Sequence, residues 1–348
     1  MLFVFFIAYL IAVVFSFVEN ENNSKKYINL YFFMMVYLIL LAGFRLPISD
    51  YTEYLYVYFN DGISRASEYK DKEITLSLIV KLSKLINNSH YTFFIIYALL
   101  GVSIKMFAIR KLSPLFFLPL VIYLSNFYIH QDMVQIRAGV ASALFLLAIK
   151  PLYERKLWPY YLLCSIALCF HYSAAVYFLV YPIIQGEHFN KKYWLLALFA
   201  SVIVAISKIN VLRITSLIPI SFIQKGISFY LSIGRWQDFQ AIGFRQILEI
   251  LLACIFIKYS DRILPHNKYF IVLLKLFMIG IIARLTLALT PVIANRISDL
   301  FLVVEIILYP MLIYTLIFKE KPVLKASVIC IGILYLLSRY SYMTERVI

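Results

Sequence analysis

Residues 1–18 read MLFVFFIAYLIAVVFSFV and contain no charged side chain. An α-helix rises about 1.5 Å per residue, so this run covers most of a hydrocarbon core about 30 Å thick. The stretch lacks the basic leading region and the small-residue cleavage site of a secretory signal peptide. We therefore expect residues 1–18 to be retained as the first membrane-spanning helix.

Similar apolar runs recur along the whole chain. Of the 348 residues, 63% are hydrophobic and 15% are charged, whereas a soluble domain has about 45–50% apolar and about 25% charged residues. The runs are continuous, unlike the alternating segments of a membrane β-barrel. The composition predicts an all-α, polytopic integral membrane protein, with residues 1–348 in a single transmembrane domain of about twelve transmembrane helices. The expected spans are 1–18, 28–44, 91–109, 114–129, 132–149, 157–171, 173–185, 193–207, 242–258, 268–288, 296–317 and 323–338.

The positive charge predicts how these spans are oriented. The net charge is +15, and in a membrane protein such an excess marks cytoplasmic loops rather than a nucleic-acid partner. If the spans alternate, six short polar breaks share one side, and each holds two or three Lys or Arg residues. Two long segments, 45–90 and 207–241, then lie on the outer side, where we expect the functional site because loops long enough to build one occur only there. The short breaks are 19–27, 110–113, 150–156, 186–192, 258–268 and 318–325.

The second half of the first outer segment has a different character. Residues 74–86 read ITLSLIVKLSKLI, with apolar residues at helical spacing interrupted by Lys81 and Lys84. This stretch is too short and too charged to cross the membrane. We expect an amphipathic helix at the membrane interface.

Ionisable residues gather where the second span leaves the membrane, in GFRLPISDYTEY at residues 43–54. Charged groups near or inside spans are costly and are functional candidates by default. Ser49 suits an N-cap position, and a helix starting there puts Asp50 and Tyr54 one turn apart. The alternative is an interfacial belt of tyrosines, Tyr51 among them, with a capping acid.

A second candidate group opens the span 132–149 from the outside. Asp132, Gln135 and Gly139 fall on one helical stripe, and Arg137 lies within the first turns. An arginine at this end opposes the helix dipole, which favours an anionic partner. The alternative is an arginine whose head group extends to the membrane surface.

His171 is a third candidate, between Phe170 and Tyr172 at the outer end of a span. A single histidine in an apolar run is more often a hydrogen-bonded core residue. Its place at the outer end of the span nevertheless makes it a candidate for proton transfer.

Four arginines lie at the outer ends of four predicted spans: Arg137, Arg245, Arg284 and Arg296. Together they predict a basic pocket on the outer face, suited to a phosphate or diphosphate, because the planar guanidinium group holds phosphate oxygens in pairs. The alternative for Arg245 is a structural ion pair with Glu249, which lies four residues later on the same helix face.

Several kinds of chemistry are not indicated. The sequence has no Walker loop, nucleophile elbow or HExxH motif, so ATP hydrolysis, serine-lipase chemistry and zinc catalysis lack support. The four cysteines lie inside apolar runs without metal-ligand spacing, and we interpret them as small core residues. No metal or cofactor is expected. The cysteines are Cys164, Cys169, Cys254 and Cys330.

Four segments, taken in order along the chain, resemble signatures of the EpsG/Wzy-like polysaccharide polymerase family. QIRAGVASALFLLAI at 135–149 resembles the family's NQIRQGLA-type segment. FHYSAAVYFLVYPI at 170–183 resembles its FHxSA segment. Each motif alone is weak, whereas four in the right order are fairly specific.

The other two segments depart from the family pattern in places. GFRLPISDYTEYLYVYF at 43–59 is similar to the outer-loop G-x-D-Y-x-x-Y element, but residues 48–49 are Ile-Ser where the family has its glycine. ANRISDLFLVVEIILYP at 294–310 resembles the late R-x-x-x-Y-F span, with Leu-Phe at 300–301 in place of the aromatic pair.

The resemblance implies an O-antigen or capsule polymerase with a GT-C-like membrane fold. Such enzymes take oligosaccharide repeat units on undecaprenyl diphosphate at the outer face of the bacterial inner membrane. They transfer the growing glycan to a new repeat unit and release undecaprenyl diphosphate, without a nucleotide sugar or an obligatory metal. The implied partners are membrane lipids and a flippase and chain-length regulator of the same pathway.

The residues identified above fit this chemistry. A departing diphosphate gains negative charge, which preplaced arginines stabilise, and the acceptor hydroxyl needs a base. Aromatic side chains of the outer loops are suited to stacking on sugars. The expected roles are diphosphate binding by Arg137, Arg245, Arg284 and Arg296, proton acceptance by Asp50 or His171, and glycan binding by Tyr51, Tyr54, Gln135 and Trp236.

Two other functions remain as alternatives. A flippase for a lipid-linked oligosaccharide would also need a basic outward cavity, but it would need a path to the inner face and broken helices as well. Only ten glycines occur, and the arginines are one-sided. A membrane acyltransferase that modifies glycans would need a histidine with an acid, and His171 has no acid adjacent in sequence.

Overall fold

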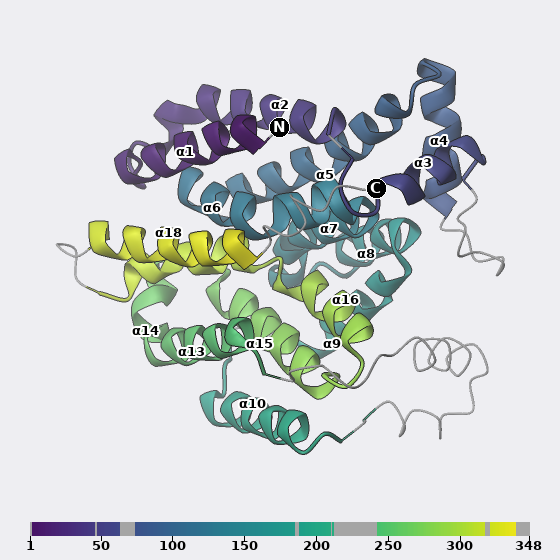
Figure 1. Ribbon diagram of the computed structural model, residues 1–348. Helices are drawn as coiled ribbons and strands as arrows, with labels where there is room; N and C mark the ends of the chain where they lie inside the picture. Colours follow the sequence, from purple (N-terminus) through teal and green to yellow (C-terminus); the bar gives the residue numbers. More distant parts are fainter. Residues whose placement is uncertain are drawn as a thin grey trace. The chain divides into compact units, whose positions relative to one another are not determined.

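The computed structural model describes residues 2–45, 47–62, 74–184, 188–209, 211, 242–316 and 321–338. Every regular element within these ranges is a helix, which confirms the all-helical prediction (Figure 1). Each of the twelve predicted apolar spans contains helical structure. The chain divides into two compact units, Met1–Tyr181 with Glu305–Ile348 and Pro182–Val304.

The first unit holds most of the helices. Short 3-10 or π-helical segments, labelled η, continue or precede several of them. The elements are α1 (Leu2–Val18), η1 (Ser24–Tyr27), α2 (Ile28–Gly43), α3 (Tyr51–Phe59), α4 (Ile74–Ile86), α5 (His90–Leu112), α6 (Phe117–Ile122), η2 (Tyr123–Val134), α7 (Ile136–Tyr153), α8 (Leu157–Phe170), η3 (Tyr172–Leu179), α17 (Glu305–Leu308), η5 (Tyr309–Tyr314) and α18 (Lys321–Ser338); α9 (Val180–Ile183) joins it to the second unit.

Four described helices are long and apolar enough to cross a membrane: Ser24–Gly43, His90–Leu112, Ile136–Tyr153 and Lys321–Ser338. A fifth is added if Pro291–Leu302 and Glu305–Tyr314 are one bent span. Further apolar helices, among them α1 and α8, are shorter. This set of helices is that of a polytopic membrane protein, while the number of twelve crossings stays a prediction.

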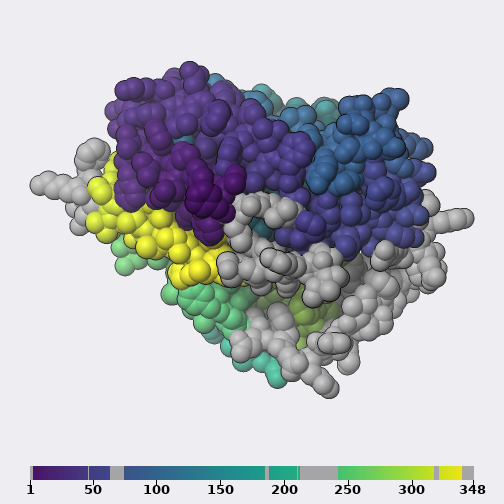
Figure 2. Space-filling model, turned by 45° about the horizontal axis from the view of Figure 1, so that its top comes forward, coloured from purple at the N-terminus to yellow at the C-terminus, as the bar shows by residue number. Residues whose placement is uncertain are grey.

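Helix α5 lies at the centre of the first unit and packs against α2, α7 and η2. A methyl group on Gly101 of α5 would overlap the carboxylate of Asp132, and one on Gly139 of α7 would overlap the Gln131 carbonyl. The two glycines therefore allow η2 to approach its neighbours closely. On another side of the unit, α18 packs against α1, and Figure 2 shows its yellow surface beside the purple N-terminal helices.

The predicted opening of a span at Asp132 is wrong. Asp132 lies inside η2, a π-helix that runs to Val134, and α7 begins only at Ile136. Asp132 and Gly139 therefore belong to different helices and do not share a helical stripe. The polar residues before Gln135 remain in a buried helix because Asp132 is neutralised there by Lys105 of α5, at 2.8 Å.

The amphipathic helix predicted at 74–86 is confirmed as α4. Its Leu76 and Ile79 are buried, and Thr75 Oγ1 donates a 2.8 Å hydrogen bond to the Cys169 carbonyl of α8. The opposite face is also apolar and is exposed, with Leu85 at 84%. A helix with one face on the protein and a second apolar face outward suits a membrane interface.

The second unit is built around α15. Its elements are α10 (Lys191–Ile206), α13 (Phe244–Lys258), α14 (Ser260–Ile263), η4 (Leu264–His266), α15 (Phe270–Thr286) and α16 (Pro291–Leu302). Helix α15 packs against α10, α13 and α16. Gly280 brings α16 close, because a Cβ atom there would lie 2.8 Å from Leu302 Cδ2. This packing fixes the charged residues near the C-terminus of α15 against α13 and α16.

Candidate functional site

Tyr54 of α3 is the residue around which the candidate site of the first unit is built. Its ring is only 5% exposed. The guanidinium carbon of Arg45, just after α2, lies 5.9 Å from the ring centroid. The guanidinium carbon of Arg137, in the first turn of α7, lies 5.8 Å from it. Two positive side chains, one just after α2 and one in α7, thus approach one phenol.

The electrostatics keep this phenol protonated. Burial raises the pKa of Tyr54 above its ordinary value, and the Arg137 charge and its hydrogen bond to the phenol lower it by less. Tyr54 is therefore neutral at physiological pH, and the positive charge of the two arginines is not cancelled by a phenolate.

Arg45 is buried, at 2% exposure, and stacks on Phe94 of α5 with its guanidinium carbon 3.8 Å from the ring centroid. Its Nη1 donates a hydrogen bond to the Met133 carbonyl at the end of η2. Its Nε and Nη2 have no hydrogen-bond partner among the described residues. The sequence placed Arg45 in a candidate segment but assigned it no role.

Asp50, rather than the predicted Ser49, is the N-cap residue of α3. Ser49 has φ +24° and precedes the cap in a left-handed conformation. The predicted spacing is confirmed, since the Tyr54 backbone N donates to the Asp50 carbonyl at 3.1 Å. The Asp50 side chain is exposed and makes no capping hydrogen bond.

Tyr51 packs inside the protein, with its ring stacked 5.1 Å from that of Phe94 and edge-on to His90. Tyr51 and Tyr54 are both buried. Any contact with a sugar would therefore use their phenol oxygens rather than their ring faces. Trp236, the fourth predicted glycan-binding residue, lies outside the described residues.

Gln135 joins η2 to α7, and its backbone N donates to the His130 carbonyl at 2.8 Å. Its side chain is half-buried, as is that of Arg137 two residues later. The prediction that Arg137 lies in the first turn of a helix is confirmed. Because the amino end of a helix is positive, this position strengthens the attraction for an anion.

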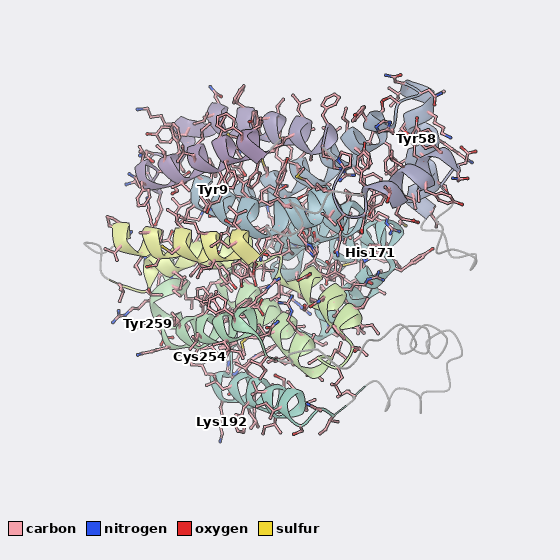
Figure 3. All side chains as sticks on the ribbon, in the orientation of Figure 1. Tyr9, Tyr58, His171, Lys192, Cys254 and Tyr259 are labelled. Carbon is pink, nitrogen blue, oxygen red and sulfur yellow. The ribbon has the colours of Figure 1, made fainter. Side chains whose placement is uncertain are left out.

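His171 ends α8 in an extended conformation, and its backbone N donates to the Ala167 carbonyl at 3.0 Å. The preceding Phe170 packs edge-on against Tyr97 of α5, 6.3 Å between ring centroids. The half-buried His171, labelled in Figure 3, thus separates α8 from η3 as the sequence predicted.

The arginines of the second unit form a different arrangement. Arg284 is 3% exposed. Its three nitrogens donate to Ser298 Oγ at 2.8 Å, to Glu249 Oε1 at 2.9 Å and to Asp299 Oδ1 at 2.6 Å. Arg245 Nε donates to the same Glu249 oxygen at 2.8 Å, which confirms the structural ion pair expected as the alternative.

This cluster is electrically balanced. Arg245 and Arg284 face the two carboxylates of Glu249 and Asp299, so an incoming phosphate would compete with acids already in place. Arg296 lies on the same helix as Asp299 with an exposed side chain. The cluster supports a structural role for Arg284.

Two site predictions concern cysteines and metals. Cys164 is buried as predicted, but Cys254 and Cys330 are exposed, so the core interpretation is wrong for those two. They lie on faces of α13 and α18 that point away from the protein, and Figure 3 labels Cys254. Within the described ranges, no three His, Cys, Asp or Glu side chains group as a metal site would require.

Comparisons with known proteins give two matches. The EpsG family model matches residues 28–347. The amylovoran biosynthesis protein AmsC of Erwinia amylovora is 25% identical over 307 residues, which are 84% of this chain and 81% of that protein. No solved structure gives a significant match.

Proposed function

Because this chain belongs to the EpsG family, we propose that it is a membrane-bound polysaccharide polymerase. In this proposal it joins oligosaccharide repeat units carried on undecaprenyl diphosphate at the outer face of the bacterial inner membrane. The observation that carries the proposal is the similarity to AmsC, a protein of amylovoran biosynthesis, over 84% of the chain. A flippase and a chain-length regulator are the expected partners.

The proposed reaction is a glycosyl transfer. The hydroxyl of a new repeat unit attacks the anomeric carbon of the growing glycan, and the bond from that carbon to the diphosphate oxygen breaks. Undecaprenyl diphosphate leaves with the bonding electrons, and the hydroxyl proton passes to Asp50 or His171. No nucleotide, metal or cofactor takes part in this scheme.

Arg137 is the first candidate for stabilising the leaving diphosphate. It is a half-buried cation in the first turn of α7, next to the neutral phenol of Tyr54. Preplaced donors of this kind stabilise charge that develops as a bond breaks. Arg296 is the candidate from the second unit because its side chain is exposed, whereas Arg245 and Arg284 form buried or half-buried ion pairs with Glu249 and Asp299.

The proposed topology follows the sequence expectations. Twelve crossings in a GT-C-like arrangement place the segments 45–90 and 207–241 on the outer side. The exposed apolar face of α4 then lies at the outer surface of the inner membrane, where the diphosphate of a lipid-linked substrate also lies. In this topology the first turns of α5 and α7, where Phe94 and Arg137 lie, are on the outer side.

The experiment uses the purified chain in liposomes with an undecaprenyl-diphosphate-linked repeat unit. A glycan ladder that Arg137→Ala abolishes and Arg110→Ala leaves intact supports the proposal. Arg110 is a matched control because it lies at the other end of α5, in a predicted cytoplasmic break. Movement of the lipid-linked unit across the membrane without any ladder identifies a flippase instead and refutes the polymerase.

A further inference from the structure

Arg45 is a buried cation without a carboxylate partner among the described residues. Among the described residues, no acid lies within ion-pair distance of its guanidinium, which is 2% exposed. Other buried cations are paired or carbonyl-bound: Lys105 with Asp132, and Lys325 with the Glu19 carbonyl at 2.5 Å. Arg45 is thus a buried cation with no counter-ion among the described residues, and an anion bound from outside could supply one.

The energetic reason is the cost of burying a charge. An ionised group taken out of water is stable only when it is paired and its polar hydrogens are bonded. Arg45 has one carbonyl acceptor and the face of Phe94, which leave Nε and Nη2 unbonded. Asp50 acts on Arg45 only through space, as one of several weaker neighbours. A bound anion would supply both the missing charge and the missing acceptors.

We propose that Arg45 and Arg137 together bind the diphosphate of the lipid carrier beside Tyr54, whose ring both guanidinium groups approach. Both guanidinium groups lie within 6 Å of that ring centroid. The diphosphate has two phosphoryl groups, each able to accept from one guanidinium fork. This inference rests on the proposed function for the identity of the lipid, while its chemistry, a diphosphate on two arginines, is tested separately.

The test measures binding, so that polymerisation does not enter the readout. The full chain is purified in detergent, and its affinity for undecaprenyl diphosphate is measured by native mass spectrometry. Loss of two charge-assisted hydrogen bonds should weaken binding by about tenfold to a hundredfold in Arg45→Gln. Arg45→Lys, which keeps the charge but not the fork, should bind with intermediate affinity.

Arg110→Gln is the matched control. Arg110 also stacks on a phenylalanine, with its guanidinium carbon 5.5 Å from the Phe32 centroid, but it lies in the last turn of α5 rather than near Phe94 in the first turns. The Arg110→Gln variant should bind undecaprenyl diphosphate with the same affinity as the wild type. Equal affinity in Arg45→Gln and wild type overturns the proposal.

Two further ligands separate the possible sources of the anion. Inorganic pyrophosphate should compete with undecaprenyl diphosphate in the wild type, and failure to compete argues against the site. Phosphatidylglycerol that binds as tightly, and depends equally on Arg45, would identify a general lipid-headgroup site and overturn the diphosphate assignment.

Failure of the polymerase and failure of this inference are distinguishable. A chain that makes no polymer but binds undecaprenyl diphosphate through Arg45 refutes the function and supports the site. If Arg45→Gln does not fold, the thermal stabilisation by undecaprenyl diphosphate is compared between the wild type and Arg45→Lys. Equal stabilisation of the two would overturn the role of the guanidinium fork.

Discussion

Replacing Lys105 by Met should strongly destabilise the protein. Lys105 and Asp132 have side chains 0% and 1% exposed. The lysine Nζ donates to both Asp132 oxygens, at 2.8 and 2.9 Å, and to the Gly139 carbonyl at 3.0 Å. Methionine keeps the length and the apolar stem, but the buried Asp132 carboxylate then keeps only the hydrogen bond that the Tyr123 hydroxyl donates to it among the described side chains, at 2.8 Å.

The magnitude follows from the uncompensated charge. Removing one partner of a buried ion pair costs about 3–5 kcal/mol, mostly because the other charge remains buried. The intact pair adds little net stability, because the cost of burying both charges offsets their attraction. The double variant Lys105→Met with Asp132→Asn removes both charges and retains an acceptor for Tyr123, so it should recover most of the loss.

The assay is unfolding in mixed micelles, followed by circular dichroism as a denaturing detergent is titrated. The single variant should unfold at clearly lower denaturant, and the double variant should unfold closer to the wild type. A single variant within about 1 kcal/mol of the wild type, or a double variant as unstable as the sum of its singles, would refute the reasoning.

Three further predictions use the same unfolding measurement. Gly101→Ala should cost about 1–3 kcal/mol, because its methyl overlaps Asp132 in a close-packed contact; an unchanged midpoint contradicts that packing. Burial raises the pKa of Glu19 to about 7, against the lowering effect of three backbone N–H groups and Lys325. The folded state thus holds the proton more tightly than the unfolded state. Protonated Glu19 therefore contributes about 3 kcal/mol to the free energy of unfolding, in full below about pH 4.5, and this contribution is lost as the pH rises to about 7. Glu19→Gln should flatten this dependence, and a profile identical to the wild type counts against it. Arg284→Gln should cost about 3 kcal/mol by leaving Glu249 and its neighbouring acid with one cation fewer; a stable variant that loses diphosphate affinity would instead show a binding role.

The helices could be predicted from sequence because the apolar runs are continuous and polar or charged residues separate most of them. Residues 1–18 and 157–171, for example, match α1 and α8 to within a residue or two. The amphipathic character of 74–86 was also visible, because lysines interrupt an otherwise apolar stripe. These features depend on local composition, which the sequence displays directly.

The polar contacts inside the bundle could not be predicted in the same way. Asp132 follows His130 and Gln131, and such a polar stretch is typical of a loop, yet it is buried in η2. What allows this is Lys105, located 27 positions earlier on α5. Only the packing of the two helices, through Gly101, brings these residues together. A pairing at that separation leaves no local pattern in the sequence.

The arginines show why position along a span is a weaker guide to function than charge balance in the folded chain. Arg137, Arg245, Arg284 and Arg296 look equivalent in sequence, since each lies at the outer end of a span. The structure separates them: Arg284 is held by two carboxylates, whereas Arg45, a fifth arginine just after α2, is buried without one among the described residues. A cation already neutralised contributes little to binding a diphosphate, because an incoming anion must displace acids that are fixed in place. A cation buried without a counter-ion gains the most from that anion. For this reason we expect substrate affinity to depend on Arg45 more than on Arg284.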